Sequence, residues 1–241
     1  RLLRHVSDAF TEDPLRILRL AQFQARLKGL GFRVHDLTTQ LCREMVARGD
    51  LDTLSRERVF KELEKALSAP HPSEFFAVLA SVNALAQLFQ GVELAETKNL
   101  DGPATDTSPP SRFSQLVLEN PDLDLQGLNK QLAIPKHWLE LASMTRTWAA
   151  AFCQVTTLSA DAILAVLERG DARRKPERFA QSVHISCQSL IIDSAEQTQI
   201  LGLWQRLVQE TAKVSLPETA SGLSGQDIKA MIRAEQLRRI E

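Results

Sequence analysis

The start of an amphipathic helix lies in residues Arg4–Arg19, RHVSDAFTEDPLRILR. Asp13 suits the N-cap position, because its carboxylate can accept from free backbone N–H groups, and Pro14 suits the first helical position. Apolar residues then recur every three or four positions, and Gly29 follows the last of them. This spacing predicts a helix over residues 14–27 that packs one face into a core.

The two faces of this helix differ in character. At about 100° per residue, the apolar side chains share one broad arc and the arginines take the opposite side. The basic side consists of Arg16, Arg19 and Arg26, with Gln22 beside them. A solvated arginine face would give the same pattern, but the carboxylates at the entrance place an acceptor, Asp13, next to these donors.

The rest of the chain predicts further helices. Tyrosine is absent, β-branched runs are few, and apolar residues repeat at three and four positions almost throughout, so the expected fold class is all-α. From start and stop signals, helices are expected over residues 37–48, 56–68, 72–80, 84–89, 125–132, 138–153, 159–169, 176–189, 195–214 and 225–240.

A break in composition divides these helices into two groups. Residues 91–111 are rich in Thr, Asp and Ser and end with Pro109 and Pro110, which is typical of a linker or a mobile loop. We therefore expect one helical bundle in residues 1–90 and a second helical domain in residues 112–241.

The bulk composition limits the possible partners. The 241 residues carry a net charge of −1, so any nucleic-acid contact must come from local patches rather than from overall charge. No apolar run approaches membrane-spanning length and no signal peptide is visible, so a cytoplasmic location is expected. The cysteines Cys42, Cys153 and Cys187 lack metal-like spacing and are expected to be buried free thiols.

The helix entrance resembles the base-recognition motif of the class II tRNA nucleotidyltransferases, the CCA-adding enzymes, whose close relatives are the bacterial poly(A) polymerases. The family motif Glu-Asp-x-x-Arg is matched here by Glu12, Asp13 and Arg16. The resemblance is strong through about Phe89 and faint afterwards. It implies that the first bundle is the neck of such an enzyme and that the second domain is its body and tail.

The resemblance assigns nucleotide binding to Glu12, Asp13, Arg16 and Arg19, with Arg19 nearer the triphosphate. Cytosine and adenine both present an amino donor beside a ring-nitrogen acceptor, so a carboxylate (Asp13) and a guanidinium (Arg16) can pair with either base. Uracil and guanine would leave unpaired groups, at a cost of about 1–3 kcal/mol each when buried. The alternative role for Asp13 is a plain N-cap.

A second segment, SRERVFKEL at residues 55–63, resembles a family motif that braces the base-reading helix. The bracing residues would be Glu57, Arg58 and Glu62. A simpler interpretation is a salt-bridged helix face, with Glu57 paired to Lys61 and Arg58 paired to Glu62.

The catalytic elements of the family are not found in the sequence. Its head domain carries a Gly-Gly loop and an Asp-x-Asp pair that holds Mg²⁺, and the string from Asp122 to Asp124 matches only the spacing. The chain begins at Arg1 without Met, so we expect a fragment that is inactive alone, with Mg²⁺ bound in the head.

We also expect no metal site in the chain itself. The doublet His35-Asp36 lacks the further histidines that a metal-dependent HD phosphohydrolase domain requires, and Asp36 suits a helix start. Residues 112–241 are therefore expected to be HD-like but without metal ligands.

Two basic patches could hold RNA phosphates without reading sequence. The candidates are Arg173, Arg174, Lys175 and Arg178 in one patch, and Lys229 and Arg233 in the other. Ordinary cations at helix ends would give the same pattern.

The leading hypothesis is the C-terminal part of a tRNA nucleotidyltransferase that adds C, A or both to the 3′ end of tRNA from CTP and ATP. Its partners would be the tRNA 3′ end, ATP and CTP, with no membrane and no DNA. A poly(A) polymerase-type enzyme is the first alternative. A non-catalytic RNA-binding helical scaffold is the second, because Gln22 replaces the arginine usual in the family.

Overall fold

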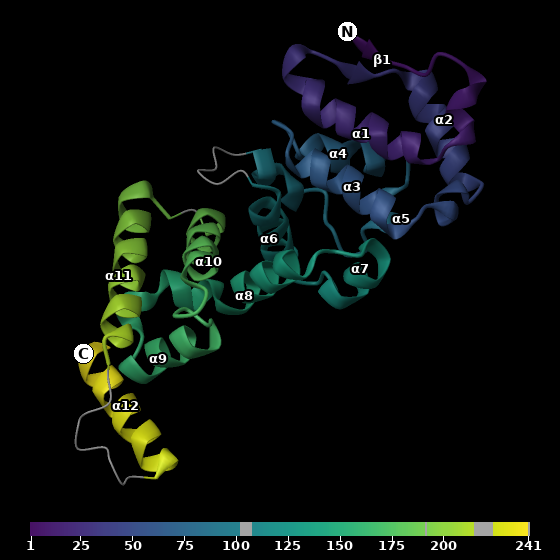
Figure 1. The fold of residues 1–241 in the computed structure, drawn as a ribbon. Helices are drawn as coiled ribbons and strands as arrows, with labels where there is room; N and C mark the ends of the chain where they lie inside the picture. Colours follow the sequence, from purple (N-terminus) through teal and green to yellow (C-terminus); the bar gives the residue numbers. More distant parts are fainter. Residues whose placement is uncertain (102–107, 191, 215–223, 241) are drawn as a thin grey trace. The chain divides into compact units, whose positions relative to one another are not determined.

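The computed structural model describes residues 1–101, 108–190, 192–214 and 224–240, and it is all-α apart from two short strands (Figure 1). The prediction of an all-α fold is confirmed. In chain order the elements are β1 (Leu2–Leu3), η1 (Asp8–Glu12), α1 (Leu15–Leu27), η2 (Lys28–Leu30), β2 (Arg33–Val34), α2 (Asp36–Ala47), η3 (Asp50–Thr53), α3 (Arg56–Leu67), α4 (Ser73–Ser81), α5 (Leu85–Leu88), η4 (Glu96–Asp101), α6 (Pro109–Glu119), α7 (Leu125–Leu132), α8 (Lys136–Cys153), η5 (Val155–Thr157), α9 (Ala160–Arg169), α10 (Pro176–Ser189), α11 (Ser194–Ala212) and α12 (Gly225–Ile240).

The chain divides into two compact units, unit 1 (Arg1–Ser143) and unit 2 (Met144–Glu241). This differs from the division predicted at residues 91–111. Residues 102–107 of that segment lie outside the described residues, but its flanks are ordered parts of unit 1, because η4 precedes them and α6 begins at Pro109.

Buried polar contacts explain why α6 belongs to unit 1. Arg112 in α6 is only 5% exposed, and its Nη1 atom donates to the carbonyl oxygens of Leu67 (2.6 Å) and Ala69 (2.7 Å) at the end of α3. Ahead of the gap, Asp101 accepts from the backbone N–H (2.9 Å) and the hydroxyl (2.5 Å) of Ser73 at the start of α4. Both flanks are thereby tied to the bundle.

The core of unit 1 forms where α1 packs against α3 and α4. The inward positions of α1, among them Ile17, Leu18 and Ala21, are fully buried, as the helical spacing predicted. Parallel pairing of β1 with β2 ties the N-terminal residues to the segment after α1. Gly31, with φ of +77°, makes the turn between η2 and β2.

The core of unit 2 is aromatic. Phe152, Phe179 and Trp204 meet edge to face, with ring centroids 5.3 to 5.8 Å apart, and Trp204 Nε1 donates to the carbonyl oxygen of Phe152 (2.9 Å). Trp204, and Trp138 in unit 1, are each 2% exposed. Both tryptophans are therefore core residues rather than exposed platforms on which a base could stack.

Helix positions agree closely with the sequence where local signals are strong. The predicted ranges 125–132, 176–189 and 225–240 coincide with α7, α10 and α12. The sequence did not predict α6, because its two starting prolines follow a polar stretch and look like the end of a linker. In the structure these prolines occupy the first turn of the helix, where proline needs no N–H partner.

We predict that Arg112→Met lowers the free energy of unfolding by about 2–4 kcal/mol, because two buried carbonyl oxygens lose their charged donor. Denaturation by urea followed by circular dichroism measures this. The matched control is Arg48→Met, whose guanidinium pairs with Asp50 at the surface (2.8 Å) and should cost less than about 1 kcal/mol. Equal losses in the two variants would contradict the buried role of Arg112.

Candidate functional site

The entrance of α1 is shaped by Asp13. This residue is extended, with φ of −129° and ψ of 104°, between η1 and the first turn of α1. Its Oδ1 atom accepts from the backbone N–H of Leu15 (3.1 Å), so the side chain satisfies one of the free donors at the helix start. The predicted positions are one residue off, because Pro14 rather than Asp13 is the N-cap and Leu15 is the first helical residue, although the Asp13 carboxylate still accepts from that first N–H.

The same carboxylate is held by an arginine from α3. Arg58 Nη2 donates to both oxygens of Asp13, at 3.0 Å to Oδ1 and 2.8 Å to Oδ2, and Arg19 Nη1 lies 4.0 Å from Oδ2. The side chains of Asp13 and Arg58 are 27% and 45% exposed. Asp13 is thus fixed in direction and still within reach of a ligand.

Arg16 has a different partner. Its Nη1 atom donates to the carbonyl oxygen of Ala9 in η1, and the side chain is half-buried. The expected base-reading pair, Asp13 and Arg16, therefore starts from one helix turn, but each side chain is engaged separately. Arg16 secures the preceding turn and Asp13 joins α1 to α3.

Arg19 lies between two carboxylates. Besides Asp13, it approaches Glu62, whose Oε1 atom is 4.0 Å from Arg19 Nε and 2.8 Å from Lys65 Nζ. The Glu62 side chain is only 4% exposed, and its Oε2 atom is buried without a hydrogen-bond partner. A buried carboxylate with a spare acceptor therefore lies beneath the exposed guanidinium of Arg19.

The segment expected to brace α1 does contact it through Arg58 and Glu62. The alternative pairs, Glu57 with Lys61 and Arg58 with Glu62, are not formed among the residues that the structure describes. Glu57 is exposed. The local i,i+4 interpretation is therefore wrong for this helix, since Arg58 reaches across to Asp13, and Glu62 pairs with Lys65 and approaches Arg19.

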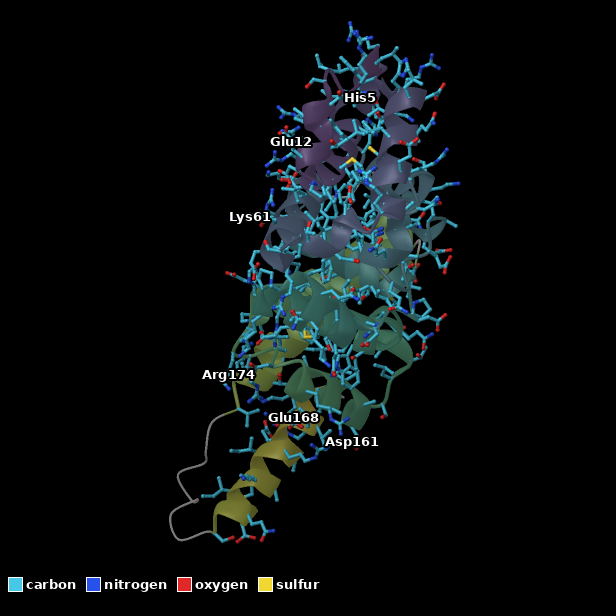
Figure 2. All side chains as sticks on the ribbon, turned by 90° about the vertical axis from the view of Figure 1, so that its right-hand side faces the viewer. His5, Glu12, Lys61, Asp161, Glu168 and Arg174 are labelled. Carbon is cyan, nitrogen blue, oxygen red and sulfur yellow. The ribbon has the colours of Figure 1, made fainter. Side chains whose placement is uncertain are left out.

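Glu12 takes no part in this cluster. It is exposed, and Figure 2 shows Glu12 and Lys61 extending into solvent on the same edge of that view. Gln22 is placed farther along α1, where it lines a groove with Phe23, Arg26 and Lys65. Phe23 is 46% exposed in that groove.

In the first basic patch of unit 2 (Arg173, Arg174, Lys175 and Arg178), two arginines donate to backbone carbonyl oxygens. Arg173 Nη2 donates to the carbonyl oxygen of Thr211, and Arg178 Nη2 donates to that of Gly170 (3.4 Å). Arg174, whose side chain is 85% exposed, lies 3.9 Å from Asp171.

In the second basic patch, Arg233 is paired with two carboxylates. Arg233 is 2.8 Å from Asp161 and 3.5 Å from Glu168. These two carboxylates and Arg174 are labelled in Figure 2. Lys229 is exposed.

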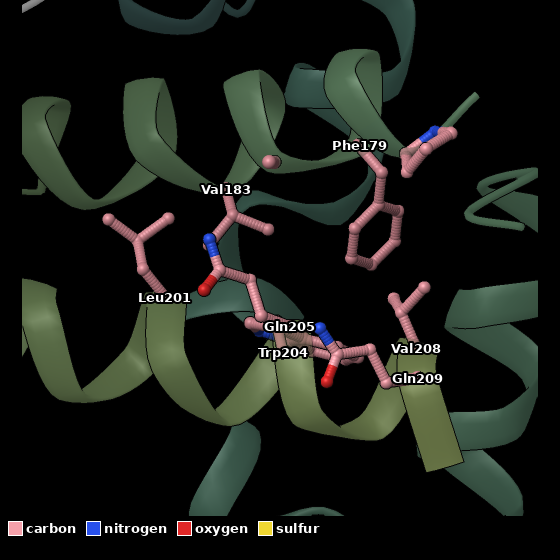
Figure 3. A pocket seen from close by; sticks show the side chains of 9 residues that line it. Phe179, Val183, Leu201, Trp204, Gln205, Val208 and Gln209 are labelled. Carbon is pink, nitrogen blue, oxygen red and sulfur yellow. The ribbon is translucent and has the colours of Figure 1, made fainter. Parts of the chain in front are cut away.

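An apolar pocket lies between α10 and α11 in unit 2 (Figure 3). Its lining includes Phe179, Val183, Leu201 and Trp204, and none of its lining residues is charged. Such a pocket offers no partner for a triphosphate.

Polar residues that could suggest a metal have structural partners. Asp124 Oδ1 accepts from the backbone N–H of Gln126 (3.0 Å) and caps α7, and His35 Nδ1 accepts from that of Leu37 (3.1 Å) and caps α2. Over the described ranges, no group of three or more His, Cys, Asp or Glu side chains could hold a metal ion. No helix in the same ranges is long and apolar enough to cross a bilayer.

Comparison with known proteins gives consistent matches. A family model described as "Probable RNA and SrmB- binding site of polymerase A" matches residues 31–95. The chain is 35% identical to the Multifunctional CCA protein of Pseudomonas putida over 246 residues, which covers 100% of this chain and 67% of that protein. It is 34% identical to the CCA-adding enzyme of Coxiella burnetii over 187 residues, covering 76% of this chain and 49% of that protein.

Solved structures share the fold. A CCA-adding enzyme in complex with CTP matches with a TM-score of 0.65 at 17% identity, over 99% of this chain and 59% of that chain. The Thermotoga maritima CCA-adding enzyme complexed with tRNA matches with a TM-score of 0.60 at 18% identity, over 99% of this chain and 60% of that chain. At these identities the likeness concerns the fold alone.

We predict that Arg16→Met loosens η1, because the carbonyl oxygen of Ala9 loses its side-chain donor. Amide hydrogen exchange of residues 8–12 should become about 5-fold faster, which corresponds to about 1 kcal/mol. The control is Arg26→Met, another arginine of α1, which should leave that segment unchanged. Unchanged protection in Arg16→Met would contradict the role of Arg16 in securing η1.

Proposed function

Because this chain belongs to the family of the CCA-adding enzymes, we propose that it supplies the base-reading part of a tRNA nucleotidyltransferase that adds C, A or both to tRNA from CTP and ATP. The observation that carries this proposal is the Asp13 carboxylate, held in a fixed direction at the entrance of α1 and still partly exposed. A template of side chains must be rigid and reachable at once.

The hydrogen-bond capacity of Asp13 supports this role. A carboxylate has about four acceptor positions, two on each oxygen. Among the residues that the structure describes, Oδ1 accepts from Leu15 and Arg58, whereas Oδ2 accepts only from Arg58, with Arg19 at a longer 4.0 Å. One acceptor position on Oδ2 therefore remains for the amino group of cytosine or adenine.

Arg16 would complete the template by donating to the ring nitrogen of the base. It must then exchange its hydrogen bond to Ala9 for one to the nucleotide. Exchanging one partner for another costs little, whereas uracil or guanine would offer no acceptor at that position and leave the guanidinium unpaired, at about 1–3 kcal/mol.

Arg19 would bind the phosphates of the incoming nucleotide. Its side chain is 47% exposed, and both of its carboxylate neighbours lie at 4.0 Å. The pair with the partly exposed Asp13 contributes less than about 1 kcal/mol, and the buried Glu62 keeps its closer partner, Lys65, at 2.8 Å. A triphosphate can therefore replace the contacts of Arg19. Glu12, one residue before Asp13 and exposed, would line the approach to this site.

Contact with RNA is proposed mainly for unit 1. The family model whose description names RNA binding covers residues 31–95, which lie entirely in unit 1. In unit 2, Arg174, Lys175 and Lys229 would add phosphate contacts. The charges of Arg173, Arg178 and Arg233 are already directed to protein groups, so their contribution is expected to be smaller.

The phosphoryl transfer itself is assigned to another part of the full-length protein. Two Mg²⁺ ions held by an Asp-x-Asp pair would activate the attacking hydroxyl, and the donor sets of the described residues do not fit such a site, since Asp124 is a helix cap. We therefore expect this chain alone to be inactive. The cytoplasmic location stays a prediction from the sequence.

One alternative is a poly(A) polymerase-type enzyme, favoured by the description of the matched family model, which names polymerase A. Use of CTP by the full-length protein on tRNA that lacks its 3′ end separates the two, because poly(A) synthesis needs ATP alone. A scaffold without catalysis would incorporate neither nucleotide.

We predict that Asp13→Ala in the full-length protein reduces discrimination of C and A over U and G about 10- to 100-fold, since the acceptor for the amino group is lost. Incorporation of each of the four nucleotides into a tRNA acceptor measures this. Asp8→Ala, which removes an exposed carboxylate from the adjacent η1, is the control and should keep wild-type selectivity. If Asp13→Ala also keeps it, the base-reading role is refuted.

We further predict that Arg58→Ala lowers the same selectivity about 5- to 30-fold while the protein stays folded, because Asp13 keeps only its contact with Leu15 and the longer one with Arg19. A loss of that size corresponds to about 1–2 kcal/mol of orientation. Arg58→Lys should recover part of the loss. Glu64→Ala, an exposed change on the same helix, is the control. Normal selectivity in Arg58→Ala would show that Asp13 needs no support from α3.

A further inference from the structure

Two cysteines that are 34 positions apart meet in unit 2. Cys153 is the last residue of α8 and Cys187 lies in α10, and their Sγ atoms are 3.7 Å apart and share a hydrogen bond. Both are free thiols, Cys187 buried and Cys153 half-buried. They pack against the aromatic core around Phe152 and Phe179. The third cysteine, Cys42, is buried in unit 1.

We propose that Cys153 and Cys187 form a reversible dithiol–disulfide site whose oxidant is a low-molecular-weight disulfide such as oxidised glutathione. Closing a disulfide requires the two sulfur atoms to approach to about 2 Å, a further movement of less than about 2 Å from their present separation. Rotation of the side chain at the end of α8 supplies such a movement more easily than rotation of the buried Cys187.

The two thiols have unequal chemical roles. The hydrogen bond that Cys153 shares with Cys187 lowers the pKa of Cys153, against the effects of burial and of the Glu196 carboxylate. The same hydrogen bond, together with burial, raises the pKa of Cys187. Since the thiolate is the nucleophile and access governs its reaction, Cys153 is the attacking residue and Cys187 is the resolving one.

The reaction takes place in two exchange steps. The Cys153 thiolate attacks one sulfur of oxidised glutathione, forms a mixed disulfide and releases one glutathione thiolate. Cys187 then attacks Cys153 Sγ, the bond to glutathione breaks, and the proton of Cys187 passes to the departing glutathione. The protein loses two electrons and two protons, and one oxidised glutathione becomes two reduced ones.

Oxidation would link the end of α8 to α10 covalently. The cross-link closes the chain from the end of α8, through η5 and α9, to α10. Arg174 and Lys175 lie within this closed stretch, so the bond would restrict the loop that carries them. A link over a loop of this length stabilises the folded state mainly by reducing the entropy of the unfolded chain.

The test uses the full-length protein incubated with oxidised glutathione and then digested without reductant. Mass spectrometry should find one peptide pair joined through Cys153 and Cys187, lighter than the reduced pair by two hydrogen atoms. The melting midpoint should rise by several degrees, on the order of 5 °C, and fall back when dithiothreitol is added. The readout on the wild-type protein does not depend on any variant folding.

Variants assign the roles. Cys187→Ser should accumulate glutathione on Cys153, Cys153→Ser should form neither adduct nor cross-link, and Cys42→Ser should behave like the wild type. The proposal is overturned if the wild-type protein keeps glutathione on Cys153 without forming the cross-link, or if Cys42 reacts as readily as Cys153. Because nucleotide incorporation takes no part in this measurement, its outcome is independent of the proposed enzymatic function.

Discussion

The ion pair between Asp13 and Arg58 is the contact on which the entrance of α1 depends. Asp13 is held locally by the N–H of Leu15 and over a long range by Arg58, which lies 45 positions later in α3. The inner face of α3 is buried in the same core as α1, with Leu63 and Ala66 fully covered. The direction of the Asp13 carboxylate is therefore set by helix packing rather than by a loop, which is the condition for a preorganised binding group.

The ion pairs around Asp13 are weak enough to be exchanged for contacts with a ligand. Asp13, Arg58 and Arg19 are all partly exposed, so their pairs stabilise the fold by only about 0–1 kcal/mol each. In the proposed template, a base that matches would replace one such partner with another at little cost. A base that does not match would leave a donor or acceptor unpaired, which costs more than the original pair contributed. Discrimination would then come from the penalty against wrong bases rather than from tight binding of right ones.

Arg112 and Arg58 show that a buried arginine and a surface arginine have different roles in unit 1. Arg112 is 5% exposed, and its Nη1 atom donates to two buried carbonyl oxygens. Breaking these hydrogen bonds would disrupt the packing of α6 on α3. Arg58 also makes two hydrogen bonds, but to the Asp13 carboxylate and from a side chain that is 45% exposed. The buried arginine thus holds helices together, whereas the surface arginine orients a carboxylate that a ligand can still reach.

The sequence could predict what local signals determine. Asp124 and Pro176 mark the starts of α7 and α10, and the spacing of apolar residues gave the buried face of α1. Contacts between residues that are far apart in the sequence could not be predicted from these local signals. Arg58 sits four positions before Glu62, so a local rule pairs the two, whereas packing of α3 on α1 turns Arg58 toward Asp13.

The division into units escaped prediction for the same reason. A polar stretch with prolines looks alike whether it separates two domains or lies on the surface of one, and only the partners of its flanks distinguish the cases. Here Asp101 binds the start of α4 and Arg112 binds the end of α3, so α6 and α7 extend the first bundle. The region matched by the family model (residues 31–95) and the Asp13 cluster consequently share one core, and the proposed base-reading residues all belong to unit 1.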